Sequence, residues 1–391
     1  MTSQTPAAST PVIVAAEHVV TPSGWLTPGW LRIADGRIEA TGEGEPPQAA
    51  SFSARWALPG FVDMHVHGGG GASFTDGDAA DARSAAAFHR AHGTTRIIAS
   101  LVTAAVDELE HRVVMLAALA DEGVVDGIHL EGPFLSAARC GAQNPRYLTV
   151  PDVAVFERLH ACARGWLKMI TIAPELPGAL DVIRAAAAVG VIAAAGHTDA
   201  SAEVTAGAIA AGVSHATHLF SGMRPFLHRD PGPVGALLDS QVTCEVIADG
   251  VHLHDTTIRL AARAAGPGNL VLVTDAMAAA GMPDGGYRLG QLDVTVTDGV
   301  ARLAAARAPS GGLGAIAGST ATMDHVVRYA VTAVGLPVPE VAEAASTTPA
   351  RRLGLAGETG ALRPGLSADL VLLDGDFRLQ TVIARGEAVP A

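Results

Sequence analysis

The chain has 391 residues, a length that suits one large domain of barrel size plus a smaller one. Its net charge of −13 argues against nucleic acid and acidic membrane surfaces as general partners. Hydrophobic residues make up 49% of the chain but aromatic residues only 4%, so we expect a sizeable core of aliphatic side chains.

The cysteines and the N-terminus indicate where the protein works. Cys140, Cys162 and Cys244 form no CxxC pair and no even framework, which favours a reducing cytoplasm. The polar start MTSQTPAASTP lacks the basic region of a signal peptide. No uninterrupted apolar stretch of about 18 residues suggests a membrane span. We therefore expect a cytoplasmic protein.

The two ends of the chain share one pattern. Residues 1–10 are expected to be a disordered tail. Short strands and turns fill residues 11–58, with a hairpin turn at Asp35-Gly36, and the same style returns in residues 360–391. The sequence therefore predicts one small β-sandwich domain made from both ends.

Residues 59–359 have a different organisation, in which short apolar runs alternate with Ala-rich helical stretches. Eight strand–helix repeats predict a (β/α)8 TIM-like barrel, and a helical bundle does not easily explain their regular spacing. The eight runs are FVDMHVHG, TTRIIAS, GIHLEGPF, LKMITIAPE, VIAAAGHT, SHATHLF, TCEVIADG and LVLVTDAM.

Polar residues stand at the ends of these runs. The carboxyl ends of barrel strands converge on one mouth, so residues more than 200 positions apart would meet there. Histidine and carboxylate in this mixture suit zinc or another divalent transition metal. The pattern predicts an enzyme that activates water with a metal. The residues are His65, His67, Glu131, His197, His218 and Asp275, and His252 follows run seven.

Several of these residues also have a purely structural explanation. Glu131, at the end of a buried strand, could form a buried salt bridge. A lone histidine is more often a satisfied core residue, the class in which we place His215, and His129 could support its neighbours. An Asp at position 275 beside a metal site could take and return a proton. Cys140 has no obvious base beside it and is not expected to be catalytic.

Other catalytic classes leave no trace in the sequence. It contains no GxxxxGK[ST] and no GxSxG motif. The run Gly68–Gly71 is too short and local to be a dinucleotide fingerprint. A P-loop enzyme and a serine hydrolase are therefore not expected.

The chain resembles the amidohydrolase superfamily, and within it the N-acetylglucosamine-6-phosphate deacetylase family, from about Val12 to the C-terminus. That family has a metal-bearing (β/α)8 barrel and a small β-sandwich from both termini, in agreement with the organisation above. The resemblance rests on PGFVDMHVHG at 59–68, HLEGPF at 129–134, TIAPE at 171–175, AGHTDA at 195–200, THLFSGM at 217–223, IADGVH at 247–252, LVTDAMAAAG at 272–281 and AGST at 317–320.

The resemblance implies roles for the polar residues. Asp275 would be the general base and acid. The metal would be a divalent ion, zinc in first place with iron, manganese or cobalt as alternatives, and one or two ions would bind per subunit. The main ion would be held by Glu131, His197 and His218, and a second site would be offered by His65 and His67.

The resemblance also implies a substrate site in a homodimer. His252 would contact the sugar or the acetyl carbonyl, and Arg229 would meet the 6-phosphate, acting from the neighbouring subunit; without that context Arg229 is an ordinary loop arginine. The sugar pocket would be lined by Ala142, Gln143, Ser221, Gly222, Ile316, Ala317 and Gly318. Ser221-Gly222 and Gln143 depart from the family, which usually has Asn-Ala and commonly a histidine there.

The activity implied by the resemblance is hydrolysis of the N-acetyl group of N-acetylglucosamine 6-phosphate, giving glucosamine 6-phosphate and acetate, in amino-sugar catabolism or cell-wall recycling. One alternative is an amidohydrolase that acts on a related hexosamine phosphate, such as galactosamine, or on a cyclic amide with Lys168 as a carboxylated bridge. Glu131 is the better bridging group. Another alternative is a non-catalytic sugar-phosphate sensor, against which the intact ligand set argues.

Overall fold

The structure is a computed structural model that describes residues 11–304 and 314–390. The tail expected to be disordered, residues 1–10, lies outside the described residues. The chain divides into two compact units. The terminal unit holds the residues up to Val62, Arg90–Thr95 and those from Pro337 on, and the barrel unit holds Asp63–His89 and Arg96–Leu336.

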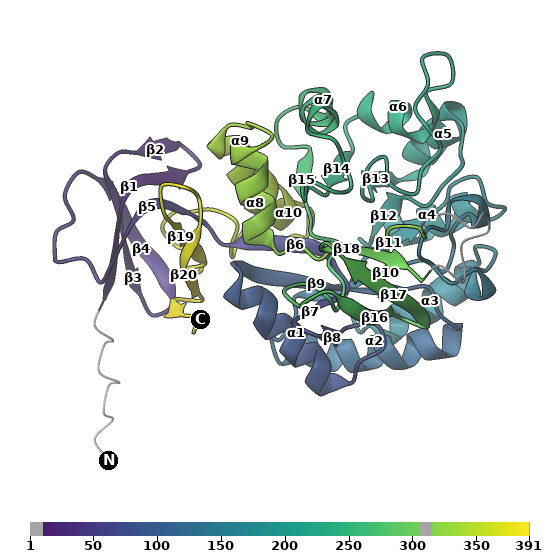
Figure 1. The fold of residues 1–391 in the computed structure, drawn as a ribbon, viewed down its shortest axis with the longest axis horizontal. Coiled ribbons are helices and arrows are strands. Elements are labelled where there is room, and N and C mark those ends of the chain that lie inside the picture. The colour runs from purple at the N-terminus through teal and green to yellow at the C-terminus, as the bar shows by residue number, and fades with distance from the viewer. Residues whose placement is uncertain (1–10, 305–313, 391) are drawn as a thin grey trace. The chain divides into compact units, whose positions relative to one another are not determined.

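Strands from both ends of the chain share one mixed sheet in the terminal unit (Figure 1), in the order β21-β20-β19-β5-β1-β3-β4 with β2 paired to β1. The two ends meet at β5, which pairs in parallel with β1 and antiparallel with β19. This confirms a small β domain built from both termini. The strands are β1 (Val12–Thr21), β2 (Gly24–Leu26), β3 (Gly29–Ala34), β4 (Arg37–Glu43), β5 (Phe52–Pro59), β19 (Leu370–Leu373), β20 (Leu379–Ala384) and β21 (Glu387–Ala388).

The β3–β4 hairpin turns at Asp35-Gly36, as predicted. Both residues have positive φ, 49° and 75°, which matches the twist that a two-residue hairpin turn needs. Alternate residues of the sheet, such as Val14 and Leu31, pack into an aliphatic core. The unit also contains α9 (Val338–Ala342), a π-helical turn and α10 (Thr348–Arg352).

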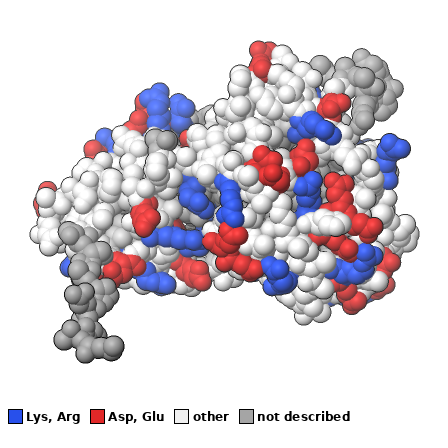
Figure 2. All heavy atoms as spheres, turned by 90° about the horizontal axis from the view of Figure 1, so that it is seen from below, with Lys and Arg blue, Asp and Glu red and all other residues white. Residues whose placement is uncertain are grey.

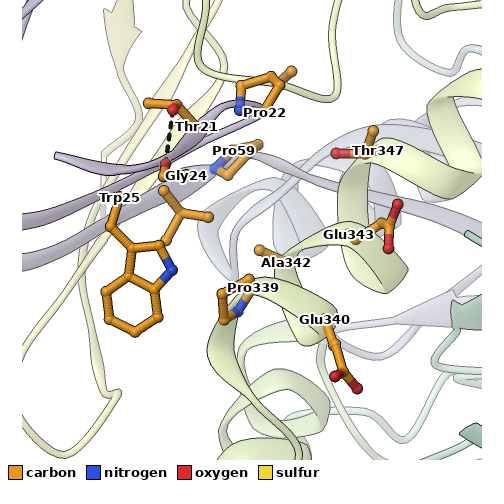
Figure 3. A pocket seen from close by; sticks show the side chains of 12 residues that line it. Thr21, Pro22, Gly24, Trp25, Pro59, Pro339, Glu340, Ala342, Glu343 and Thr347 are labelled. Atoms are coloured by element: carbon orange, nitrogen blue, oxygen red, sulfur yellow. Dashed lines mark hydrogen bonds between the residues drawn. The ribbon is translucent and has the colours of Figure 1, made fainter. Parts of the chain in front are cut away.

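A pocket of about 350 Å³ lies within the terminal unit, beside the π-helical turn (Figure 3). Its wall combines the indole of Trp25 with prolines such as Pro22 and Pro339, and the carboxylates of Glu340 and Glu343. None of the residues with an expected role in binding or catalysis lines this pocket.

The second sheet contains eight strands in chain order, from β6 to β15. The pairs from β9 to β15 are parallel, as expected for βα repeats. A parallel bridge between Val66 and Ala276 joins the two ends of this sheet, so the barrel is nearly closed and the predicted fold is confirmed. The strands are β6 (Phe61–Val66), β9 (Thr94–Val102), β10 (Gly127–Glu131), β11 (Leu167–Ile172), β12 (Ile192–Ala195), β13 (Val213–Ala216), β14 (Thr243–Val246) and β15 (Leu270–Leu272).

Helices follow the barrel strands, and their buried faces are rich in Ala, Val and Leu. The core is mostly aliphatic, as expected. Among the described residues, the helices are too short or too polar to span a membrane. The helices are α1 (Ala79–Ala91), α2 (Val106–Asp121), α3 (Val153–Cys162), α4 (Ala179–Ala188), α5 (Ala202–Ala211), α6 (Gly232–Leu238), α7 (Asp255–Ala265) and α8 (Met323–Thr332).

A three-stranded antiparallel sheet that sequence analysis did not identify lies between β15 and α8 in the chain. It consists of β16 (Gly285–Leu289), β17 (Leu292–Thr297) and β18 (Val300–Leu303). On the face drawn in Figure 2, Lys and Arg side chains lie interspersed with Asp and Glu, and no extended basic area is visible on that face.

Candidate metal centre and active site

The barrel unit brings together all six residues expected to bind metal or move protons. They lie at or just beyond the carboxyl ends of β6, β10, β12, β13 and β15, and all are buried. They form two groups, and within each group the candidate ligand atoms lie within 4.8 Å of one another. The first group is Glu131, His197 and His218, and the second is His65, His67 and Asp275.

The first group converges on one carboxylate oxygen. Oε1 of Glu131 lies 2.9 Å from Nε2 of His197 and 3.0 Å from Nε2 of His218. The two imidazole nitrogens are themselves 3.0 Å apart. This arrangement presents two nitrogens and one oxygen to a single point.

The second group lies beside the first and shares Glu131 with it. Nε2 of His65 and Nε2 of His67 are 3.1 Å apart, and Oδ1 of Asp275 lies 3.2 Å from Nε2 of His67. Oε1 of Glu131 is 3.4 Å from Nε2 of His65, and Oε2 is 3.3 Å from Nε2 of His67. Glu131 therefore stands between the two groups, as a bridging carboxylate would.

The hydrogen bonds on the far side of the rings indicate that these groups fit a metal ion. Nδ1 of His65 donates to Glu245, Nδ1 of His67 to the carbonyl of Ser100, and Nδ1 of His197 to the carbonyl of Arg139. In the neutral rings the Nε2 atoms therefore carry lone pairs, and two lone pairs about 3 Å apart repel unless a cation lies between them. Imidazole and carboxylate donors together suit zinc and similar divalent ions.

Backbone strain marks the same places. His197, His218 and Asp275 have positive φ values of 46°, 25° and 48°, a region that non-glycine residues rarely occupy. Such strain is retained where the surrounding structure demands it, often at functional sites. Here it occurs just beyond the ends of β12, β13 and β15, where the chain leaves the barrel.

The electrostatics of the site favour positive charge. Burial opposes the charged form of His67, but its bonds to Asp275 and Glu131 outweigh burial and raise its pKa to about 9. Burial would raise the pKa of Glu131, but the charges of His65 and His197 hold it well below its usual value. The field that stabilises an imidazolium here would also stabilise a bound metal cation.

A cavity of about 260 Å³ opens onto these groups. Most of the residues expected to contact substrate line this cavity, together with most of the candidate metal ligands. Asp275 is also part of the lining, so a reacting group in the cavity can reach it. The lining residues predicted from the sequence are His67, Glu131, Ala142, Gln143, His197, His218, Ser221, Gly222, His252, Asp275, Ile316 and Gly318, and those not predicted are Gly141, Leu289 and Ala315.

The sequence profile of the amidohydrolase family matches residues 56–389. The chain belongs to the amidohydrolase family. It is 36% identical to N-acetylgalactosamine-6-phosphate deacetylase of Escherichia coli O157:H7 over 96% of this chain and 98% of that one. It is 34% identical to N-acetylglucosamine-6-phosphate deacetylase of Bacillus subtilis (strain 168) over 94% of each.

Solved structures give the same result. A mutant N-acetyl-D-glucosamine-6-phosphate deacetylase from Mycobacterium smegmatis, in complex with N-acetyl-D-glucosamine 6-phosphate, is 44% identical with a TM-score of 0.92. The alignment covers 98% of this chain and 100% of that one. Fold and sequence therefore place this amidohydrolase beside deacetylases of amino-sugar phosphates.

Some expected site residues of this amidohydrolase do not reach the cavity. His65 is fully buried, and Ala317 packs into an aliphatic cluster with Val294 and Val296. Ile316 and Gly318, on either side of Ala317, line the cavity. Arg229 is exposed on a turn and does not line the cavity of its own chain.

Lys168 is not placed to bridge two metals. Its Nζ donates to the carbonyl of Gly165 and lies 5.4 Å from the centre of the Trp166 ring. Lys168 and Thr171 have opposite parity on β11, and Thr171 is bonded to His129 within the barrel, so Lys168 faces outward. The alternative of a carboxylated lysine is therefore wrong.

Gln143, one of the two departures from the family pattern, contacts Glu131, a candidate metal ligand. Its amide donates to Oε2 of Glu131 at 2.5 Å, and its carbonyl accepts from the backbone N–H of Thr103 at 2.7 Å. Gln143 therefore holds one oxygen of the bridging carboxylate as well as lining the cavity.

His252 lines the cavity in a fixed orientation. Its Nδ1 donates to Oδ2 of Asp249 at 2.7 Å, and the other Asp249 oxygen accepts from the backbone N–H groups of Val251 and His252. Burial opposes the charged form of His252, but the bond to Asp249 outweighs it and raises the pKa of His252.

Sequence reasoning missed two carboxylates that organise the site, Asp249 and Glu245. Glu245 lies fully buried inside an apolar run, where a charged residue without partners would be very unfavourable. That cost is the signal that could have found it. His215 is a satisfied core histidine as expected, bonded to Thr243 and Glu245. His129 bonds Ser100 and Thr171 and belongs to neither ligand group.

Proposed function

We propose that this amidohydrolase hydrolyses the N-acetyl group of N-acetylglucosamine 6-phosphate to give glucosamine 6-phosphate and acetate, in the catabolism of amino sugars. The observation that carries the proposal is the pair of ligand groups joined by Glu131 beneath a cavity lined by Asp275. The relatives named above act on amino-sugar phosphates.

The chain's own residues suggest how the reaction proceeds. A divalent cation, which we propose to be zinc, would be held by Glu131, His197 and His218, and when bound it supplies the Lewis acidity that makes water acidic near neutral pH. Asp275 accepts the proton of the attacking water and returns it to the departing sugar nitrogen. His252, held by Asp249, donates a hydrogen bond to the acetyl carbonyl or the sugar.

We also propose that the protein acts as a homodimer in the cytoplasm. Arg229 is exposed, and no ion pair involves it among the described residues. Phe226 and Leu227, on the same loop, are 54% and 55% exposed. These features support a loop that packs against a second subunit and presents Arg229 to the 6-phosphate in the partner's cavity. The three cysteines are unpaired, as a reducing compartment favours.

A second candidate substrate is N-acetylgalactosamine 6-phosphate. The relative from Escherichia coli O157:H7 that bears this name matches 96% of this chain at 36% identity, between the 34% of the glucosamine enzyme from Bacillus subtilis and the 44% of the one from Mycobacterium smegmatis. Ser221, Gly222 and Gln143 line the cavity and depart from the usual pattern, so the choice between the two sugars depends on them.

The test is acetate release from both N-acetylhexosamines, each with and without the 6-phosphate, together with metal analysis of the same sample. We expect release from a 6-phosphate substrate at least ten-fold faster than from its unphosphorylated form, because Arg229 would orient the anion. No acetate release from any of the four compounds by protein with bound metal would refute the proposal and favour the sensor.

A further inference from the structure

Glu245 is a buried carboxylate that belongs to neither ligand group, yet contacts both. It lies on β14, its side chain is fully buried, and it does not line the cavity. Its Oε2 accepts from Nδ1 of His65 at 3.0 Å and from the backbone N–H of His218 at 2.9 Å. Its Oε1 accepts from Nε2 of His215 at 2.9 Å.

The bond from His65 determines which nitrogen of that ring can bind a metal. An ionised carboxylate only accepts hydrogen bonds, so Nδ1 of His65 must carry the hydrogen and Nε2 must carry the lone pair. That Nε2 lies 3.1 Å from Nε2 of His67 and 3.5 Å from Oδ1 of Asp275. Glu245 therefore aims the lone pair of His65 at the second ligand group.

His65 differs from the other anchored histidines in the kind of partner that holds it. His67 and His197 donate their Nδ1 hydrogens to backbone carbonyls, those of Ser100 and Arg139. Backbone partners persist whatever side chain the residue carries. The Nδ1 hydrogen of His65 is held by one replaceable side chain, and the rings of His65 and His129 pack in a T-shaped arrangement with centroids 4.6 Å apart.

We propose that Glu245 is the positioning residue that makes the second ligand group, His65, His67 and Asp275, competent to bind a second metal ion. The proposal deepens the proposed function, because it takes the two groups as the enzyme's metal centre. The backbone N–H of His218 donates to the same oxygen, but the His218 ring, which faces the first group, makes no bond to Glu245.

Metal titration of the full-length protein tests this without substrate. The protein is stripped by dialysis against a chelator and titrated with Co²⁺, whose visible absorption reports each ion bound, with Zn²⁺ retention measured in parallel. We expect wild type to bind two equivalents. Glu245→Ala should bind the first within a few-fold of wild type and the second about 10–100-fold more weakly, the usual effect of removing a partner of a metal-binding histidine.

Two further variants separate positioning from general damage. Glu245→Gln keeps an oxygen that can accept from His65 but lacks the charge, so its affinity for the second ion should lie between those of wild type and Glu245→Ala. This variant also tests the proposal if the alanine variant does not fold. Thr243→Val is the matched control, since Thr243 shares strand and face with Glu245 and bonds His215 but not His65. It should bind both equivalents like wild type.

Three results would overturn the proposal. In the first, wild type binds only one equivalent of Co²⁺. In the second, both Glu245 variants bind the second ion as tightly as wild type. In the third, Thr243→Val loses as much affinity for the second ion as Glu245→Ala. Because no substrate is present, these results are independent of the acetate assay. A protein that binds two ions but releases no acetate would remove the proposed activity and leave the role of Glu245 standing.

Discussion

Asp275 belongs to the second ligand group and also lines the cavity, which is where a proton carrier must lie. Its Oδ1 is 3.2 Å from Nε2 of His67, and the residue keeps a strained backbone with φ of 48°. Burial would raise the pKa of Asp275, but the charge of His65 and the bond to His67 lower it, so Asp275 is ionised and can accept a proton.

We predict that Asp275→Asn lowers kcat by about 10²–10⁴-fold, the range that general acid–base catalysis supplies. The amide keeps the shape of the side chain but cannot accept the proton. Acetate release and metal content should be measured on the same sample. Metal content should stay near that of wild type, because the proposed ligands of the main ion, Glu131, His197 and His218, are unchanged. A variant that keeps more than about a tenth of wild-type kcat would exclude this role.

The pair of Asp249 and His252 predicts a pH effect with a defined sign. The raised pKa of His252 contributes stability that is present below its unfolded pKa, about 6.5, and is lost as pH rises through the folded pKa. Burial would raise the pKa of Asp249, but the bond to His252 lowers it, so its contribution is present above about 3.9 and is lost as pH falls through the folded pKa.

We therefore predict that Asp249→Asn lowers the pKa of His252, because burial then acts without the carboxylate that opposes it. NMR titration of the His252 ring, assigned with His252→Gln, measures the shift. An unchanged pKa in Asp249→Asn would mean that Asp249 does not set the charge of His252.

For single residues, the sequence predicts the candidate metal ligands better than it predicts the residues that hydrogen-bond and orient them. His65, Glu131 and Asp275 could be found because each stands at the end of an apolar run. In a barrel the carboxyl ends of the strands converge on one mouth, so such residues come together. Glu245 could not be found in this way, because it sits within a run and its partners come from β6 and β13, far away in the sequence. The cost of burying its charge was the available signal.

Among the strands, too, some were predicted from the sequence and others were missed. All eight barrel strands were predicted, since a helical stretch separates each apolar run from the next. The sheet β16–β18 was missed, although β17 alternates buried and exposed residues and is followed by a turn at Asp298-Gly299. The alternation of apolar and polar residues in β17 could be seen in the sequence. The sheet, however, interrupts the βα repeat between β15 and α8, where the barrel pattern predicts only a connection.

The N-terminus of α3 offers a stability prediction at the same scale. Asp152 precedes the helix, and its Oδ1 accepts from the backbone N–H of Ala154 at 2.8 Å. Asp152→Ala should reduce stability by about 1 kcal/mol, the usual loss on removing such a cap. Thermal unfolding measures the change. Asp152→Asn, which can still accept, should resemble wild type; equal destabilisation in both variants would contradict the cap.

For the whole molecule, the proposed homodimer with Arg229 acting across the interface predicts complementation between subunits. A chain with Arg229→Ala keeps Asp275, and a chain with Asp275→Asn keeps Arg229, so a mixed dimer would have one complete site. Each variant alone should be nearly inactive on the 6-phosphate substrate. Random assortment after co-expression should restore about a quarter of wild-type activity, since half of the dimers are mixed and each has one working site.

The control for this experiment is to mix the two proteins after purification, without subunit exchange, which should restore nothing. Co-expression that also restores nothing, in a preparation shown to contain mixed dimers, would mean that Arg229 serves its own chain or no site at all.

The bridge between Val66 and Ala276 has a consequence for how the protein is made. It joins β6 to the segment just after β15, at opposite ends of the barrel sequence, so His65, His67 and Asp275 meet only after the ribosome has released that segment. Glu131, His197 and His218 have all emerged some 57 residues earlier (275 − 218 = 57). Synthesis from the N-terminus therefore makes the residues of the first group available before the second group is complete, and a chain that ends before Asp275 lacks one residue of the second group.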